Sequence, residues 1–363
     1  MTVVLVIVIL VFLILAHEFG HFAAAKLFGI RVDEFGIGFP PRAILFGKAG
    51  GTEYTLNWIP FGGFVRLYGE EEDRDQHGRG SFIDSPRWKQ AIVLVAGVLM
   101  NAIVAWALFA GALATGVPSI VDQLQPNETS QLLVSDVIPA SPASAAGITA
   151  GDRILSLEDQ QGNMPAALTP TAVAAFVEDR GGRQLVLTYL HGNATTTSTI
   201  IPANSVDPQN AGRPAIGVGL VLVANVALPP LEAMHQALWT TEGSFVIVSQ
   251  SLWQILKTAL HGSPDLSGVV GPVGLVSQVG DAARNGWGEV LELAAFISVN
   301  LTIVNLIPIP ALDGGRLVVL FLEAIMRKSA PKLVVQLLNT IGVALIILLM
   351  VTVTYHDIAR LFT

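Results

Sequence analysis

The sequence predicts a mainly α-helical membrane protein with about four transmembrane helices and one long insert of soluble character. Three observations predict this fold class. Of the 363 residues, 52% are hydrophobic and only 13% are charged, whereas soluble domains carry about 25% charged residues. The mean hydropathy is +0.60. Four apolar segments are long enough to form a helix that crosses a bilayer, which takes about 20 residues.

Three of the apolar segments contain no charged residue, and they cover residues 91–121, 293–312 and 333–355. The fourth runs from Met1 to Ala25 and is interrupted only by His17, Glu18 and His21. A secretory signal peptide is the alternative for this first segment, but such peptides begin with basic residues. Residues 1–16 contain no Lys or Arg, so we expect a transmembrane helix.

The distribution of basic residues predicts the orientation in the membrane, because cytoplasmic loops carry an excess of Lys and Arg. Residues 26–89 hold nine of them and residues 316–332 hold four, whereas the 167 residues from 118 to 284 hold six. We therefore expect the first two regions on the cytoplasmic side, and the termini and the long insert on the opposite side. The expected location is the plasma or inner membrane, as a multi-pass protein in contact with the lipid bilayer.

Charge and cysteine content exclude several classes of partner and site. The formal net charge is −8, without a cluster of Lys or Arg, so we expect no nucleic-acid partner. The chain has no cysteine, which excludes a thiolate nucleophile and thiolate metal ligands. Any metal site must therefore use His, Asp or Glu.

The insert has the alternating pattern of a small β-rich domain. Residues 134–160, VSDVIPASPASAAGITAGDRILSLEDQ, indicate a strand, a short helix, a turn at Gly151–Asp152 and a second strand. This pattern resembles a PDZ domain, and residues 183–190 and 215–223 are predicted to be further strands. An unrelated β-rich domain is the alternative. After the insert, residues 231–260 have near-helical apolar spacing with interspersed charges, which favours an amphipathic helix at the membrane surface over a fifth span.

The first apolar segment contains candidate metal ligands and a candidate catalytic residue. On a helix, His17 and His21 lie on one face, one turn apart. Two imidazoles placed in this way can bind one metal ion, and Glu18 can reach a water on that metal. Structural histidines are the alternative. Within a membrane an ionisable side chain costs about 2.5 kcal/mol or more and is usually functional, so three such residues within five positions favour a metal site.

A catalytic zinc needs a third protein ligand and leaves one position for water. Asp313 follows the apolar segment 293–312 directly, after a stretch broken by Pro308 and Pro310. Irregular backbone at membrane depth occurs where it lines a cavity or is buried in protein. With the orientation above, Asp313 and the histidines lie at matching depth, so we expect Asp313 to be the third ligand. A turn residue at a helix end is the alternative.

The expected chemistry is hydrolysis. Bound Zn²⁺ would lower the pKa of its water towards about 7, and Glu18 would take the proton from that water and pass it to the leaving amine. Asn305 is a candidate donor to the substrate carbonyl or the developing oxyanion. A hydrogen bond between membrane helices is the alternative role for Asn305.

These features together resemble one known family. HEFGH at 17–21, NLIPIPALDGG at 305–315 and a PDZ-like insert between the second and third apolar segments resemble the site-2 protease family of intramembrane zinc metalloproteases, peptidase M50, and in particular the bacterial regulator of sigma-E proteases. Three further segments are similar to that group: GTEYTLNWIPFGGFVRLYGE at 51–70 to its membrane-associated β-hairpin, AGVLMN at 96–101 to its second-span motif, and GPVGL at 271–275 to the segment before its third span.

The resemblance implies a metalloendopeptidase with zinc on His17, His21 and Asp313, Glu18 as catalytic acid and base, and Asn305 assisting substrate binding. It implies single-span membrane substrates, such as anti-sigma factors or remnant signal peptides, with an upstream site-1 protease as a further partner. We expect the hairpin edge near Gly62 and Gly63 to pair with an extended substrate, and the PDZ domain to exclude substrates with bulky outer domains.

Two features depart from the family pattern. The insert has room for one PDZ domain, whereas the best-known enterobacterial members have two, and Arg316 stands where a His often follows the LDGG motif. We expect the arginine to leave zinc binding unaffected. Two alternative functions are a catalytically idle PDZ scaffold with a structural metal, which has no need of Glu18, and an ion carrier, for which the chain lacks an inverted repeat.

The predicted division of the chain is as follows: transmembrane helices at 1–28, 90–117, 286–312 and 333–356, a loop with the membrane-associated β-hairpin at 29–89, the PDZ domain at 118–225, an amphipathic helical linker at 226–285, and a cytoplasmic-side segment at 313–332.

Overall fold

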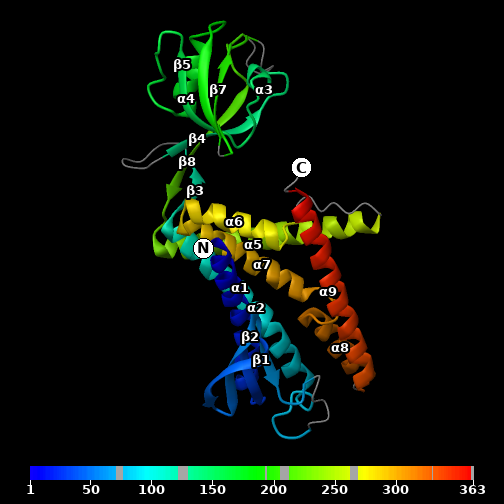
Figure 1. The fold of residues 1–363 in the computed structure, drawn as a ribbon. Helices are drawn as coiled ribbons and strands as arrows, with labels where there is room; N and C mark the ends of the chain where they lie inside the picture. The colour runs from blue at the N-terminus through cyan, green and yellow to red at the C-terminus, as the bar shows by residue number, and fades with distance from the viewer. Residues whose placement is uncertain are drawn as a thin grey trace. The chain divides into compact units, whose positions relative to one another are not determined.

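The computed structural model describes residues 1–70, 77–121, 130–192, 194–204, 212–261, 269–328 and 330–360. They form two compact units (Figure 1). The membrane unit consists of Met1–Thr115 and Leu228–Thr363, and the insert unit consists of Gly116–Ala227. The long apolar helices belong to the membrane unit, and the insert unit is built around a β-sheet. The predicted fold class, a mainly helical membrane protein with an inserted α+β domain, is confirmed.

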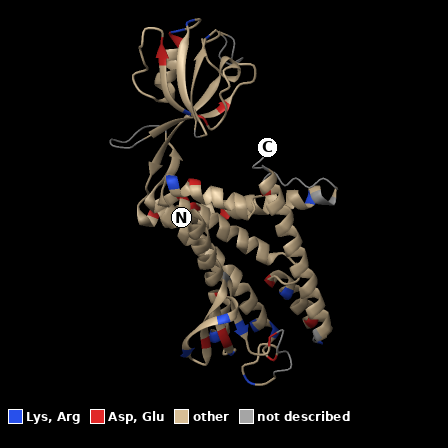
Figure 2. Ribbon diagram, viewed as in Figure 1, with Lys and Arg blue, Asp and Glu red and all other residues tan. Residues whose placement is uncertain are grey.

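Four of the described helices are long and apolar enough to cross a membrane. They are α1 (Thr2–Leu27), α2 (Arg87–Thr115), α7 (Trp287–Leu306) and α9 (Lys332–Arg360). The middle portions of these helices carry few charged residues, whereas charges gather on the β-hairpin (Figure 2). Helix α2 packs against both α1 and α7, so it is the central helix of the site described below.

The second spanning helix ends earlier than its apolar sequence predicts. We expected a boundary at residue 117 within the apolar segment 91–121, but α2 ends at Thr115. Gly116 follows with φ of +97°, a conformation that glycine adopts at little cost. The next residues form strand β3 (Val117–Ile120), which pairs with the end of the insert's last strand. Hydrophobicity alone does not distinguish a helix end from an adjoining strand.

The predicted linker at 226–285 contains two helices, α5 (Pro230–Leu260) and α6 (Pro272–Asn285). As its charges predict, α5 is not among the described helices apolar enough to cross a membrane. Its exposed side chains nevertheless include several large apolar residues: Leu231, Leu238, Trp239, Trp253 and Leu256. Exposed tryptophan and leucine on a helix with interspersed charges are typical of a helix at a membrane surface.

The segment at 313–332, predicted only as a connection, contains helix α8 (Asp313–Met326). It begins directly after the loop with Pro308 and Pro310. Gly314 and Gly315 pack against this loop so closely that a Cβ at position 315 would lie 2.2 Å from the carbonyl oxygen of Ile309. Only glycine permits that approach, and the first turn of α8 is thereby held close to the end of α7.

The β-hairpin has two long strands, β1 (Val32–Ala49) and β2 (Thr52–Leu67), joined by a turn at Gly50–Gly51. Both strands bend, so residues 34–37 of β1 pair with residues 53–56 on one side and with residues 63–66 on the other. Residues 63–67 therefore form an outer strand. Within the described part of the chain this outer strand is paired on one side only.

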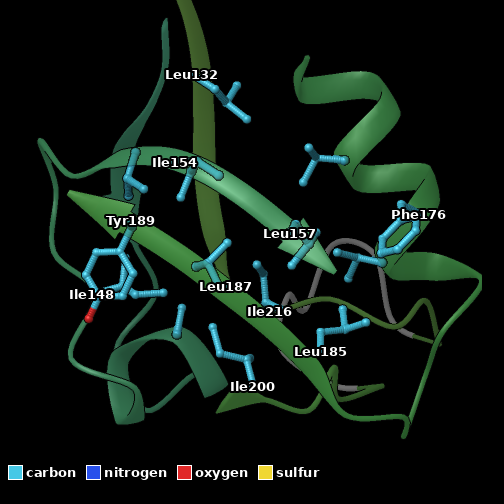
Figure 3. Close-up of a cluster of buried hydrophobic side chains, with 14 of the residues drawn as sticks. Leu132, Ile148, Ile154, Leu157, Phe176, Leu185, Leu187, Tyr189, Ile200 and Ile216 are labelled. Carbon is cyan, nitrogen blue, oxygen red and sulfur yellow. The ribbon is translucent and has the colours of Figure 1, made fainter. Parts of the chain in front are cut away.

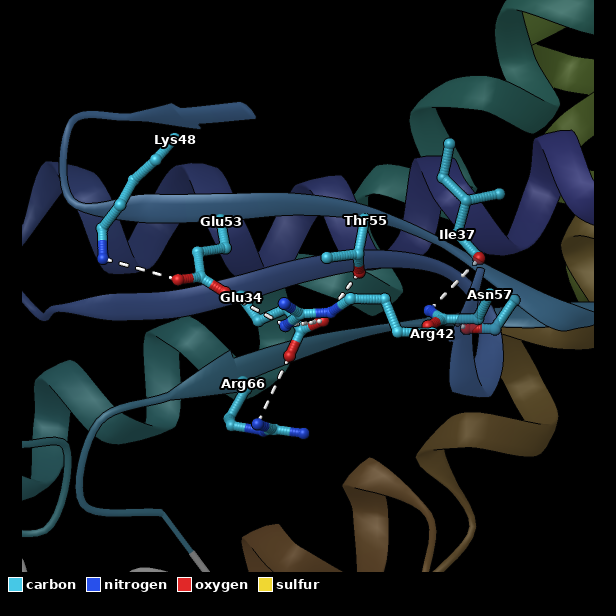
Figure 4. A network of polar contacts seen from close by, with 9 residues as sticks. Glu34, Ile37, Arg42, Lys48, Glu53, Thr55, Asn57 and Arg66 are labelled. Carbon is cyan, nitrogen blue, oxygen red and sulfur yellow. Dashed lines mark hydrogen bonds and ion pairs between the residues drawn. The ribbon is translucent and has the colours of Figure 1, made fainter. Parts of the chain in front are cut away.

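A buried carboxylate holds the hairpin together (Figure 4). Glu34 accepts a hydrogen bond of 2.7 Å from Oγ1 of Thr55 and forms ion pairs of 3.1 Å with Arg42 and 3.3 Å with Arg66. Asn57 donates from Nδ2 to the carbonyl oxygen of Gly38 over 3.1 Å. A buried charge is tolerated only with such partners, so this network fixes how the strands bend and thus where the outer strand runs.

The insert unit has one antiparallel sheet with the strand order β3-β8-β4-β5-β6-β7. Its other elements are β4 (Ser130–Val137), α3 (Pro142–Ala145), β5 (Arg153–Asp159), α4 (Pro170–Glu178), β6 (Leu185–His191), β7 (Ala194–Ile200) and β8 (Val218–Val226). The predicted strand, short helix and strand are β4, α3 and β5. Ser141 caps α3 and Thr169 caps α4, since each side chain accepts an N–H of the first turn.

The core of the insert unit lies between its sheet and its two short helices (Figure 3). Leu132, Leu157, Leu185 and Leu187 are almost completely buried, and Phe176 of α4 packs on them. The alternation of buried residues along β6 shows why its sequence, LVLTYLH, forms a strand with one covered face. This unit has a hydrophobic core of its own.

Candidate metal centre

Helix α1 places the two histidines of HEFGH side by side. His17 and His21 are both buried, and their Nε2 atoms are 3.1 Å apart. The rings meet edge to face, at an interplanar angle of 83°. This arrangement follows from their spacing of four residues on a helix, as the sequence predicts.

Asp313, the first residue of α8, completes the cluster. Its Oδ2 lies 3.0 Å from Nε2 of His17 and 3.3 Å from Nε2 of His21. Asp313 is also buried. The close packing of Gly314 and Gly315 on the preceding loop brings this carboxylate to the histidines, although nearly 300 residues separate them in the sequence.

The three side chains fit a zinc ion. One ligand atom from each lies within 4.8 Å of the others. Ligand atoms of a tetrahedral zinc site are about 3.4 Å apart, given metal–ligand distances near 2.1 Å, and the three distances above, 3.0, 3.1 and 3.3 Å, are close to that spacing. In addition, Oδ2 of Asp313 is buried, and its contacts with the two histidine nitrogens do not have the geometry of a hydrogen bond. A buried carboxylate oxygen without a hydrogen bond costs free energy. A cation bound between the three ligand atoms would give this oxygen a partner.

Helix α2 supports both histidines from the opposite side. The Nδ1–H of His21 donates to the carbonyl oxygen of Val93 over 2.8 Å, so the lone pair on Nε2 is available to a metal ion. The amide nitrogen of Asn101 lies 3.3 Å from Nδ1 of His17. Between these positions, Gly97 leaves room for the rings, because a Cβ there would lie 2.3 Å from Nε2 of His21.

The close approach of α1 and α2 depends on a second glycine. A Cβ at Gly20 would lie 2.3 Å from the carbonyl oxygen of Ala96. Small residues at such crossings let membrane helices approach closely. AGVLMN entered the predictions only as part of a family resemblance, without a role for Gly97 or Asn101. The signal was their spacing of four, which places both on one face of an apolar helix.

All seven residues predicted for the site line one cavity of about 780 Å³. They are His17, Glu18, His21, Gly62, Gly63, Asn305 and Asp313. Gly63 of the outer strand lies close to the catalytic candidate, since a Cβ there would be 3.5 Å from Cγ of Glu18. Asn305 stands in the last turn of α7, and Ile346 and Met350 of α9 line the cavity as well.

Two charged residues of the cavity were not predicted. Arg316 and Glu70 both line it and form an ion pair with each other. The other carboxylate oxygen of Glu70 accepts the backbone N–H of Leu67 at the end of β2, over 3.3 Å. Glu70 therefore links the end of the outer strand to the first turn of α8, where Asp313 stands.

This link predicts a coupled effect on stability. Glu70→Gln and Arg316→Gln should each lower the free energy of unfolding by about 1 kcal/mol, and the double variant by little more than either alone, because the partners contact each other. Thermal unfolding in detergent measures the effect. The exposed pair Asp281–Arg284 is the control, for which we expect no measurable coupling. Additive losses in the double variant would refute the link.

Comparisons with known proteins identify the family of the chain. A model described as peptidase family M50 matches residues 5–349. A Clostridium perfringens protein whose name describes it as a zinc metalloprotease is 36% identical over 95% of each chain. A Synechocystis protein similarly named is 32% identical over 89% of this chain and 85% of its own. An Arabidopsis thaliana protein named as a chloroplastic membrane metalloprotease is 31% identical over 94% and 76%.

Among solved structures, the insert is similar to the PDZ domain of an SdrC-like protein from Listeria monocytogenes. The match is 21% identical, covers 27% of this chain and 92% of that domain, and has a TM-score of 0.22. The family match and the relatives cover almost the whole chain, and the relatives are named zinc metalloproteases. The cofactor expected from the sequence, Zn²⁺, is therefore confirmed, and the chain belongs to peptidase family M50, the site-2 protease family of membrane zinc metalloproteases.

Proposed function

We propose that the protein is an intramembrane endopeptidase that hydrolyses peptide bonds in or near the transmembrane segment of single-span membrane proteins. One observation supports this most strongly: a metal-binding group, an acidic side chain and an outer β-strand line a single cavity among apolar helices. A transmembrane helix keeps its backbone bonds internal, so cleavage requires a place where an extended segment and water meet. In this cavity an outer strand is available for an extended segment, and a metal-binding group and an acidic side chain are available to activate water.

In this proposal His17, His21 and Asp313 hold the zinc. When bound, zinc polarises the scissile carbonyl and makes water a better nucleophile at neutral pH. The Glu18 carboxylate takes a proton from the attacking water as the C–O bond forms. Glu18 then passes this proton to the amine nitrogen as the C–N bond breaks. The carboxylate is regenerated in each turnover, and the new carboxyl and amino ends leave the site.

Substrate binding is assigned to the hairpin and to α7. Residues 63–66 pair with β1 on one side only among the described residues, and an extended substrate can pair with their other side as an added strand. Gly63 would bring that strand next to Glu18. Asn305 lines the same cavity, and its amide is a neutral donor for the substrate carbonyl.

The expected biological setting is regulated intramembrane proteolysis in the plasma or inner membrane. The excess of Lys and Arg in residues 26–89 and 316–332 supports an active site towards the cytoplasm, with the insert unit on the opposite side. Anti-sigma factors and remnant signal peptides are the proposed substrates. An upstream site-1 protease is a proposed partner, with the PDZ-like insert excluding substrates whose outer domains are still bulky.

Metal removal tests the proposal. The purified protein is reconstituted in vesicles with a labelled single-span substrate, such as a signal-peptide remnant. We expect cleavage to stop after chelation and to return with one equivalent of zinc. Cleavage by His21→Ala should not return with zinc. His261→Ala changes an exposed histidine directly after α5 and should behave as wild type. Cleavage that survives removal of the metal would contradict the mechanism, and a zinc-loaded protein inactive on such substrates would favour the scaffold alternative.

A further inference from the structure

Asn101 is a buried polar residue whose hydrogen bonding is incomplete. It is fully buried on α2. Its backbone carbonyl oxygen accepts a hydrogen bond of 2.8 Å from Oγ of Ser298, which joins α2 to α7. Its side-chain nitrogen faces Nδ1 of His17 at 3.3 Å, and its side-chain oxygen Oδ1 is buried without a hydrogen-bond partner. An unsatisfied buried oxygen costs about 1–3 kcal/mol.

The orientation of the Asn101 amide is coupled to the position of the proton on His17. With Nδ2 towards Nδ1 of His17, the amide nitrogen donates and Nδ1 accepts, so the proton of a neutral ring is on Nε2. In that tautomer Nε2 has no lone pair to offer a metal. Yet Nε2 is the atom that lies 3.0 Å from Asp313 and 3.1 Å from Nε2 of His21. Binding of zinc by Nε2 therefore requires the proton on Nδ1 and an acceptor beside it.

Reversal of the Asn101 amide supplies this acceptor. A rotation of the amide exchanges Oδ1 and Nδ2, which have nearly the same size and shape. Oδ1 then accepts from Nδ1–H of His17 and gains a hydrogen bond, while Nδ2 takes the position in which Oδ1 had no partner. Val93 already holds the second ligand in this way, because its carbonyl oxygen accepts from Nδ1–H of His21. Both acceptors come from α2, on either side of Gly97.

We propose that Asn101 is a positioning residue that sets the metal-binding tautomer of His17, with its side-chain oxygen accepting Nδ1–H when zinc is bound. The inference rests on the proposed metal site and adds a residue that contacts neither metal nor substrate. Partners of this kind orient ligand imidazoles, and their loss lowers metal affinity about 10- to 100-fold. A simple bond between membrane helices is the competing role.

Two substitutions separate these roles. Asn101→Leu is close in size but has no acceptor, and Asn101→Asp keeps only acceptor atoms. Zinc affinity is measured by chelator competition on the full chain in detergent, without substrate, and thermal unfolding of the metal-free protein is measured in parallel. We expect Asn101→Leu to weaken zinc binding 10- to 100-fold without lowering metal-free stability. We expect Asn101→Asp to bind zinc at least as tightly as wild type.

Three results would overturn the role of Asn101. The first is wild-type zinc affinity in Asn101→Leu, and the second is a loss of ten-fold or more in Asn101→Asp. The third is a fall in the metal-free stability of a folded Asn101→Leu variant as large as its loss of zinc-binding free energy, which points to a structural bond. Asn101→Asp still decides the matter where Asn101→Leu does not fold. Equal zinc affinity in wild type and His17→Ala would instead overturn the metal site itself and, with it, the proposed function.

Discussion

Glu18→Gln is expected to abolish peptide hydrolysis while zinc stays bound. The amide has nearly the same shape as the carboxylate, but it takes no proton from water and returns none to the leaving amine. General acid–base catalysis contributes about 10²- to 10⁴-fold in rate, so the residual rate should fall by at least two orders of magnitude. Both cleavage of a reconstituted single-span substrate and metal content per chain are measured.

The matched control for Glu18 is Glu242→Gln on α5, an exposed glutamate that does not line the metal cavity. It should cut at the wild-type rate. A zinc-loaded Glu18→Gln variant that also cuts at the wild-type rate would show that another group accepts the proton. Loss of zinc from Glu18→Gln would show that the glutamate belongs to the metal site rather than to the catalytic step.

Gly97→Ala should remove zinc binding and destabilise the protein, although it adds only one methyl group. That methyl would lie 2.3 Å from Nε2 of His21 and 2.9 Å from Cε1 of His17. It overlaps the ligand rings, which cannot move away without losing the bond between His21 and Val93. Overpacking of this kind costs about 1–3 kcal/mol, and we expect zinc affinity to fall at least 100-fold. Chelator competition and thermal unfolding measure the two effects.

Gly111→Ala is the control on the same helix. Its Cβ would meet Cδ1 of Leu291 at 3.4 Å, an ordinary contact. Alanine is a better helix former than glycine by about 1 kcal/mol, so this variant should be neutral or stabilising and should bind zinc normally. Gly97→Ala is thus expected to lower the stability of the protein, and Gly111→Ala to leave it unchanged or raise it. Wild-type zinc affinity in Gly97→Ala would mean that the rings do not lie against α2.

The parts of the site that could be predicted from sequence are local ones. The pairing of His17 with His21 follows from helix geometry, and the cost of polar groups in a membrane identifies them as functional. The break around Pro308 and Pro310 predicted irregular backbone before Asp313, and α7 ends at Leu306 and α8 begins at Asp313. The four apolar segments were likewise sufficient to predict four spanning helices.

Other features depend on contacts between distant segments. The apolar segment at 91–121 gave no sign that the helix ends at Thr115, because β3 is defined by its pairing with β8. Arg316 was expected only to leave zinc binding unaffected. Its ion pair with Glu70 was not predicted, because Glu70 is 246 positions earlier in the chain. The double pairing of residues 34–37 also could not be predicted, since it arises from bends in both strands.

The sequence by itself thus determined three features: the class of membrane protein, the residue types of the metal ligands and the acidic residue Glu18 next to His17. These follow from composition and from spacing within single helices. Only the tertiary structure decided how the site is supported, with Gly97 making room for the rings, Val93 and Asn101 beside their outer nitrogens, and Glu70 joined to Arg316. The physical reason is that each of these contacts joins residues remote in sequence, so no local pattern reports them.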